Sequence, residues 1–183
     1  EDCNVLYIID SYFLKNSAEN GGAVYIDAVK SCSMQNSTYI LNKALDEGGA
    51  LKITDRLSYH LRMIVSIINC LFLKNEGHFG GATHIVKSSK ICILNSQFVK
   101  NYASVKGSAS YIEHFHNVLY FNCFMVRNDI STIKISDGNG VQMKNCIFEN
   151  NTGHSGSAMY VKECNMIQLE QVQFVSNSAS TSS

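Results

Sequence analysis

The stretch Asn69-Cys70-Leu71-Phe72-Leu73-Lys74-Asn75 contains the short motif that decides the fold. It reads polar, small, variable, aromatic, variable, variable, Asn, and a second clear copy is Asn145-Cys146-Ile147-Phe148-Glu149-Asn150-Asn151. Copies recur along the whole chain. The aromatic position, which holds Met in one copy, falls at Phe13, Tyr39, Phe72, Phe98, Met125, Phe148 and Phe174. Successive copies are 26, 33, 26, 27, 23 and 26 residues apart, and a repeat of this length predicts a solenoid.

The residues before each motif alternate as they do in a half-buried strand. Apolar residues such as Val65 and Ile91 stand four positions before the first polar residue, and Ile67 and Ile93 stand two positions before it. The residue between them is often polar, as Ser66 is. We expect the strand to continue through the polar and small residues to the aromatic residue.

Every copy ends on an Asn, three residues after the aromatic position. These residues are Asn16, Asn42, Asn75, Asn101, Asn128, Asn151 and Asn177. If the coils stack, their side-chain amides form a hydrogen-bonded ladder along the axis. We also expect these Asn residues to adopt left-handed backbone angles in a turn.

A glycine-rich turn and a further strand follow each Asn, as in residues 21–26 and 48–53, and the fifth copy is shortened to residues 131–135. Alternation places Val24 inside the coil and Tyr25 outside, together with the neighbouring Ala column. The outward row would contain Tyr25, Lys52, His84, Tyr111, Lys134 and Tyr160. Aromatic and cationic side chains suit sugar rings or a partner protein, which makes this row a candidate binding surface. The alternative is that these are ordinary exposed strand residues that cover the rod.

These patterns predict an all-β chain folded as a single right-handed parallel β-helix of about seven coils. The β-helix occupies residues 1–177, which we interpret as a segment of a longer solenoid, and residues 178–183 form a Ser-rich tail or linker. The 33-residue interval contains an insertion near residues 55–62, which we place in a loop of the third coil.

Composition excludes several classes of function. A hydrophobic content of 45% supports a continuous core, and zero net charge gives no support for nucleic-acid binding. No apolar run is long enough to span a membrane. Residue 1 is not Met and no signal peptide is evident, so we interpret the chain as a mature or excised segment. Three of the seven cysteines, Cys70, Cys123 and Cys146, occupy the small position of the motif, where we expect buried small residues and predict no disulfide.

The alternation of Gly-Gly-Ala and Phe-x-x-Asn motifs resembles the repeats of chlamydial polymorphic outer-membrane proteins and, more broadly, the pectin-lyase-like β-helix superfamily. Phe-x-x-Asn is literal at Phe13/Asn16, Phe72/Asn75, Phe98/Asn101, Phe148/Asn151 and Phe174/Asn177, and Gly-Gly-Ala at residues 21–23, 48–50 and 80–82. The resemblance covers residues 3–177 and implies a β-helix. Because the superfamily contains polysaccharide lyases and hydrolases, it also requires that an enzyme be considered.

Catalytic chemistry is not indicated. No two Asp residues share an outward column on adjacent coils, so paired catalytic carboxylates are not evident. Glu19, Asp46 and Glu47 lie in successive glycine-rich turns, where the alternatives are a weak calcium site or solvated turns. The segment 113–117, with His114 and His116 on one face of a strand, offers a metal site or an ordinary polar turn. In both places we expect the simpler alternative, hence no cofactor and no metal.

We therefore expect a structural or adhesive protein, extracellular or at the cell surface, that associates with itself through coil ends or faces into a filament. Glycans or surface proteins are the other expected partners, without nucleic acid and without a membrane span. The alternatives are a polysaccharide lyase or hydrolase and a non-catalytic carbohydrate-binding module. Asn150 and Asn36 match the glycosylation pattern and are candidate acceptors.

Overall fold

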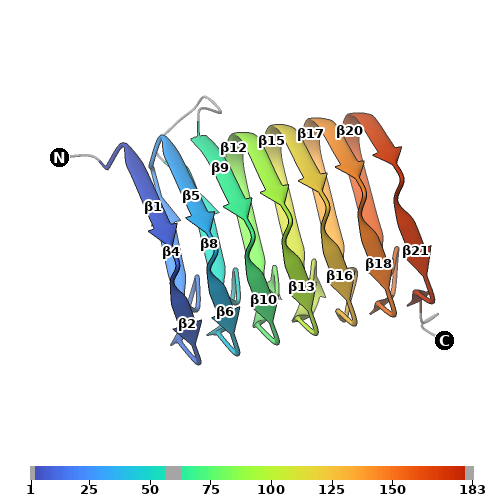
Figure 1. Cartoon of the computed structure of the whole chain (residues 1–183), viewed down its shortest axis with the longest axis horizontal. Coiled ribbons are helices and arrows are strands. Elements are labelled where there is room, and N and C mark those ends of the chain that lie inside the picture. Colours follow the sequence, from blue (N-terminus) through green and yellow to red (C-terminus); the bar gives the residue numbers. More distant parts are fainter. Residues whose placement is uncertain (1–2, 57–62, 180–183) are drawn as a thin grey trace.

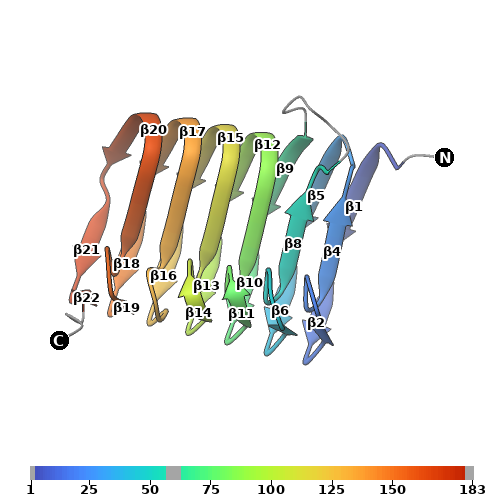
Figure 2. The same cartoon turned by 180° about the vertical axis from the view of Figure 1, so that it is seen from behind.

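The computed structural model describes residues 3–56 and 63–179, and these residues wind into a parallel β-solenoid (Figure 1). Strands of successive coils pair side by side in sequence order, and the N- and C-terminal ends lie at opposite ends of the rod (Figures 1 and 2). Seven strands stand in each of the two longest rows, and six full turns separate the first from the last. The prediction of one all-β parallel β-helix of about seven coils is confirmed.

The strands of the described residues form four sheets. The largest has a seven-strand path of β1 (Val5–Ile9), β5 (Ser31–Gln35), β9 (Met63–Ile68), β12 (Thr83–Leu94), β15 (Ser110–Phe121), β17 (Ile133–Lys144) and β20 (Met159–Glu170), joined by β4 (Val24–Asp27) and β8 (Leu51–Thr54). The second contains β2 (Tyr12–Leu14), β6 (Thr38–Ile40), β10 (Leu71–Leu73), β13 (Gln97–Val99), β16 (Phe124–Val126), β18 (Ile147–Glu149) and β21 (Gln173–Val175). The third contains β3 (Ser17–Ala18), β7 (Lys43–Ala44), β11 (Glu76–Phe79) and β14 (Tyr102–Lys106), and the fourth β19 (Thr152–Gly153) and β22 (Ser178–Ala179).

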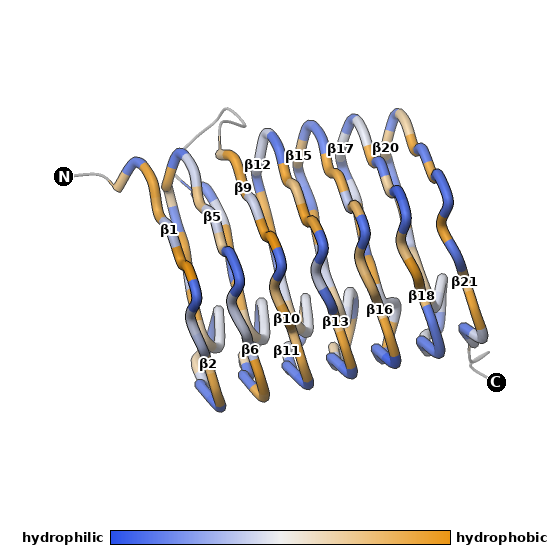
Figure 3. Tube along the Cα trace, viewed as in Figure 1, coloured by the Kyte–Doolittle hydropathy of each residue, from blue (hydrophilic) through white to orange (hydrophobic). Residues whose placement is uncertain are grey.

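Like residues lie on like residues inside the rod. Phe72 pairs with Tyr39 on one side and with Phe98 on the other, and each ring stacks on the next at a centroid distance of 4.8 Å. The stack begins at Phe13 and, after Met125, continues at Phe148. Apolar strand residues recur from coil to coil in the same way (Figure 3). The interior is therefore a set of axial files of matching side chains, as the repeat predicted.

The Asn ladder is also confirmed. In each interior step the backbone N and the side-chain Nδ2 of one Asn both donate to Oδ1 of the next, as Asn42 does to Asn75 at 3.0 Å and 3.0 Å. Nδ2 also donates to a carbonyl of the preceding coil, from Asn75 to Tyr39 O at 3.0 Å. The backbone prediction was wrong, because the left-handed residue is the one before the Asn, for example Lys74 with φ 54°.

The first polar residue of the motif does not continue the strand, which corrects a second prediction. Asn69 has φ 53°, and the corresponding residues Asp10, Asn36, Asn95, Asn122, Asn145 and Gln171 are left-handed as well. This residue forms the corner at which the chain leaves the largest sheet and enters the second. Asn and Asp adopt left-handed angles at less energetic cost than most residues, which explains the polar preference at this position.

The residue after that corner is small for a hydrogen-bonding reason. Ser37 Oγ donates to the carbonyl of Gln35 at 2.8 Å and accepts from the backbone N of Ser11 at 3.1 Å. Cys70 fills the same position and directs its thiol to the carbonyl of Ile68 at 3.3 Å. Cys70, Cys123 and Cys146 are buried, and all seven cysteines of the chain are free thiols, in agreement with the predicted small buried residues.

The Gly-Gly pairs allow coil backbones to approach closely. A Cβ built on Gly49 would lie 2.0 Å from the carbonyl oxygen of Gly81 in the next coil. Its neighbour Gly48 has φ 67°, the left-handed region that favours glycine. These two requirements explain the Gly-Gly pairs that precede β4, β8 and β12.

Three sequence features fall where the repeat breaks. The shortened fifth coil has no third-sheet strand among the described residues, only the isolated bridge between Tyr102 and Asp129. Most of the expected insertion, residues 57–62, lies outside the described part of the chain. Strand β22 places residues 178–179, which we expected in the tail, in the solenoid. No helix in the described ranges is long and apolar enough to cross a bilayer.

Candidate functional site

The residues of the outward row lie next to one another, as expected, but most of their side chains are covered. This corrects the expectation that the row is exposed. The register places Tyr25, Lys52, His84, Tyr111, Lys134 and Tyr160 on successive neighbouring strands. Tyr25 at the N-terminal end is 41% exposed, whereas His84 is 1% exposed and Lys52, Tyr111 and Lys134 are buried. The neighbouring alanines, among them Ala82, belong to the core. Stacking along the row and residues of the adjacent turns, such as Phe79, cover these side chains.

Lys52 is held by a carboxylate from the preceding glycine-rich turn. Its Nζ lies 2.6 Å from Glu47 Oε2 and 3.1 Å from His84 Nδ1. Since an ammonium group can only donate, Nδ1 of His84 is the acceptor and the proton of the neutral imidazole resides on Nε2. Burial lowers the pKa of Lys52 and the pKa of His84, which for His84 favours the neutral ring.

Glu113 collects the other side of this network. His84 Nε2 donates to Glu113 Oε1 at 3.3 Å, and Tyr111 OH donates to Glu113 Oε2 at 2.7 Å. The His84 hydrogen bond is the main reason that the pKa of Glu113 is lowered to about 2, so the carboxylate is anionic at neutral pH. Burial and the nearby Glu113 raise the pKa of Tyr111. The His84 and Tyr111 rings stack at 4.6 Å, which fixes both donors.

Lys134 continues the row as a cation between two rings. Its Nζ lies 4.4 Å from the centroid of Tyr160 and 5.8 Å from that of Tyr111, both within the range of cation–π attraction. Burial, followed by repulsion from Lys106 and Lys162, lowers the pKa of Lys134. A hollow of about 240 Å³ opens beside Lys134 and Tyr160, and its lining includes Lys106, His154 and Ser155.

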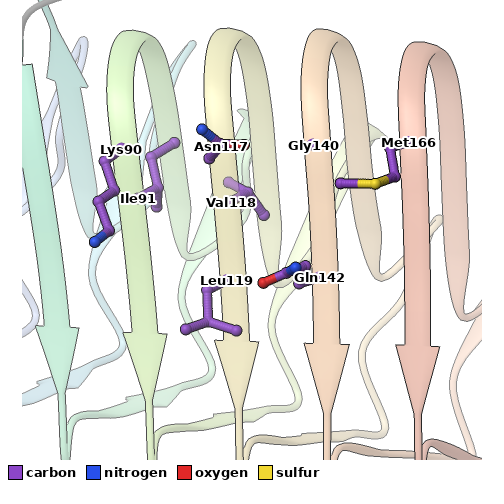
Figure 4. Close-up of a pocket in the computed structure, with 8 residues that line it drawn as sticks. All are labelled: Lys90, Ile91, Asn117, Val118, Leu119, Gly140, Gln142 and Met166. Carbon is purple, nitrogen blue, oxygen red and sulfur yellow. The ribbon is translucent and has the colours of Figure 1, made fainter.

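A second hollow, of about 330 Å³, lies on the outer face of the largest sheet (Figure 4). It forms where Gly140 interrupts a column of side chains between Asn117 and Met166. Met166 extends toward Gly140, and Lys90 and Leu119 stand on neighbouring strands (Figure 4). The hollow offers amide and ammonium groups beside apolar carbon.

The segment 113–117 differs from the prediction that His114 and His116 share one face of a strand. His114 and His116 do not act together, because His114 is a left-handed corner residue with φ 52°. The ligand atoms of Glu113, His114 and Asp137 instead all lie within 4.8 Å of one another. Glu113 and Asp137 therefore form a carboxylate pair across adjacent coils, which the alignment of Asp residues alone did not reveal.

The other candidate residues have ordinary surroundings. Glu47, in one of the glycine-rich turns considered as a calcium site, forms an ion pair with Lys52. Asn36 is exposed at a strand corner and accepts from Asn69 Nδ2 at 3.2 Å, and exposed Asn150 donates to Glu149 at 3.0 Å. Both Asn residues remain accessible candidates for glycosylation.

Sequence reasoning considered Glu47 and the segment 113–117 only as metal candidates, and it missed that Glu47 and Glu113 bind the outward row. Glu47 comes from a turn and Glu113 from the strand position two residues after Tyr111, so neither belongs to the outward row. The available signal was Lys52 and Lys134 in one row, because a lysine that becomes buried needs an acidic partner nearby.

Residues 10–27 match the sequence model of the Chlamydia polymorphic membrane protein repeat. The matched segment contains the first Phe-x-x-Asn motif and the first Gly-Gly-Ala turn. No curated protein matches the chain. The chain is a parallel β-helix that resembles this repeat, and the similarity is consistent with a cell-surface location.

Proposed function

We propose that this chain is a structural and adhesive β-helix displayed at a cell surface, and that its rods extend by stacking coil on coil. The similarity to a membrane-protein repeat supports the surface setting. The observation that carries the proposal is the state of the last coil. Ile167, Leu169 and Phe174 belong to the interior files but are 48%, 43% and 48% exposed.

The corresponding residues one coil earlier show what is exposed at that end. Val141, Met143 and Phe148 are 0%, 1% and 0% exposed, because a further coil covers them. An added coil would remove the same apolar surface from water on Ile167, Leu169 and Phe174. It would also pair the open strand edge, which otherwise templates association.

The two ends are complementary in polarity. Within the ladder each Asn donates toward the C-terminal side and accepts from the N-terminal side, as the Asn151-to-Asn177 bonds of 2.8 Å and 3.0 Å show. Asn177 therefore presents donors at one end, and Asn16 presents its side-chain oxygen at the other. Such a contact is head-to-tail and does not close, so repeated contacts produce a filament.

Sedimentation velocity over a range of concentrations, with electron microscopy of the largest species, tests this proposal. We expect the wild-type chain to form elongated oligomers and Phe174→Asp to remain monomeric. Val175→Asp is the matched control, because Val175 is 43% exposed but points away from the interior files. A wild-type chain that stays monomeric at high concentration, or equal loss of assembly in both variants, would refute stacking through the coil end.

A second candidate function, carbohydrate binding without catalysis, is favoured by the hollow beside Lys134 and Tyr160. Glycan-array binding should be lost in Tyr160→Ala and retained in Tyr102→Ala, whose ring is 40% exposed but does not line the hollow. We propose that no bond cleavage accompanies binding, because no carboxylate is among the described residues that line this hollow. Release of reducing ends from acidic polysaccharides, with and without calcium, would contradict this and favour a lyase or hydrolase.

A further inference from the structure

Two corner residues and one strand residue bring three metal-ligating groups together on adjacent coils. Glu113 pairs with Ser136 and Phe115 pairs with Gly138, so His114 and Asp137 occupy the same corner of neighbouring coils. Both are left-handed, with φ 52° and 60°. The repeated corner therefore directs the two side chains to the same side of the rod, beside Glu113.

Glu113 is already oriented as metal-binding carboxylates usually are. His84 and Tyr111 each donate to one of its oxygens, at 3.3 Å and 2.7 Å, and both donors belong to the outward row. Each carboxylate oxygen keeps a further lone pair for a ligand. Hydrogen bonds of this kind fix the direction of a ligating group and strengthen metal binding.

We propose that Glu113, His114 and Asp137 bind a divalent transition-metal ion of the zinc class, with water completing the coordination. One imidazole nitrogen and two carboxylate oxygens form a donor set that zinc accepts. Ligand atoms around a tetrahedral zinc lie about 3.4 Å apart, so the group must contract by up to about 1.4 Å from separations of up to 4.8 Å. His114 is exposed and can make that movement by side-chain rotation.

The donor set disfavours calcium, which takes six or more oxygen ligands. Within residues 3–56 and 63–179, no lysine or arginine forms an ion pair with Glu113 or Asp137. Lys162 pairs with Glu163 at 2.9 Å, and Lys134 lies over the ring of Tyr160. A bound metal would add a link between β15 and β17 at a corner where the two strands already pair on both sides.

Isothermal titration of the tag-free chain with zinc chloride tests the proposal. We expect one site per chain, with affinity at least 10-fold weaker in His114→Ala and in Asp137→Asn. His116→Ala is the matched control, since His116 is also exposed, lies two residues further along, and is not in the group. Its affinity should stay within 2-fold of the wild type.

A second measurement separates a built site from scattered surface binding. Cobalt titration should give a visible absorption band of tetrahedral or five-coordinate Co²⁺ that is absent in His114→Ala. Tyr111→Phe, which removes one hydrogen bond to Glu113, should weaken zinc binding by about 10-fold or more. Wild-type affinity in His114→Ala, or equal losses in His116→Ala, would overturn the assignment.

Discussion

The Asn ladder allows a quantitative test of what holds the coils together, through the change Asn75→Ala. Asn75 is fully buried, and its side chain makes four hydrogen bonds. Oδ1 accepts from the backbone N and from Nδ2 of Asn42, and Nδ2 donates to Tyr39 O and to Asn101 Oδ1, all at 3.0 Å. Removing the amide leaves these partners in a site that water does not reach.

The expected loss follows from counting those bonds. A buried hydrogen bond contributes about 1 kcal/mol net, and a buried polar group left unsatisfied costs about 1–3 kcal/mol. Four bonds therefore predict a loss of about 4 kcal/mol in the free energy of unfolding, a large fraction of the 5–15 kcal/mol typical of a domain. The ladder's end provides the control. The exposed Asn16 side chain donates only to Asn42 Oδ1, so Asn16→Ala should cost about 1 kcal/mol.

Equilibrium urea unfolding, followed by far-UV circular dichroism, measures both variants against the wild type. The midpoint should shift strongly for Asn75→Ala and slightly for Asn16→Ala, with similar slopes. Equal shifts would contradict the count of hydrogen bonds, because the Asn75 side chain makes four and the Asn16 side chain makes one. A loss of less than about 1 kcal/mol in the free energy of unfolding for Asn75→Ala would refute the claim that the side-chain amides stabilise the stack.

Three further predictions follow from the glycine turns, the buried ion pair and the buried imidazole. Gly49→Ala should lower the thermal midpoint far more than Gly140→Ala does. The Cβ added at residue 49 would lie 2.0 Å from a backbone oxygen, whereas the Cβ added at residue 140 would first meet the side chain of Asn117, which can move away. Glu47→Gln should cost about 2–3 kcal/mol by urea unfolding, since it leaves Lys52 buried, while Glu76→Gln in the exposed pair with Lys43 should cost less than about 0.5 kcal/mol. The pKa of His84 is lowered in the folded chain, so its stabilising effect is complete above the unfolded pKa of about 6.5 and is lost as pH falls toward the folded value. The thermal midpoint should therefore drop between pH 7.5 and 5, and should drop less in His84→Gln.

The interior could be predicted from sequence because each file repeats one kind of residue. Phe72 above Tyr39 and Asn75 above Asn42 follow directly from the motif spacing, and the register pairs them as expected. Spacing also located the shortened fifth coil. Stacking identical groups satisfies the same contacts in every coil, so the signal accumulates along the chain.

The outward row could not be predicted in the same way. Alternation predicts the face of the strand from which the Lys52 side chain projects. It does not predict whether a neighbouring turn covers that face. The partner of Lys52, Glu47, belongs to a turn, where no period-two pattern applies. The left-handed corner at Asn69 was missed for a related reason, since an Asn inside an alternating run fits a polar strand residue as well as a corner. Its recurrence as Asn, Asp or Gln in every coil was the usable signal.

The division between interior and exterior explains how such a chain can acquire new sites without changing its fold. The ladder and the ring stack fix the separation of coils, as the 4.8 Å ring spacing shows. Two residues at equivalent outer positions are therefore held together whatever their identity. His114 and Asp137 are 23 residues apart, the length of the shortened coil, and the register of β15 with β17 makes them neighbours. Restoring the missing residues between positions 128 and 131 should leave the corner contact intact, since the added length would fall in the turn that precedes β17. An inserted turn that disrupted the contact would mean that the metal-ligating group depends on the shortened coil itself, and not on the stacking register.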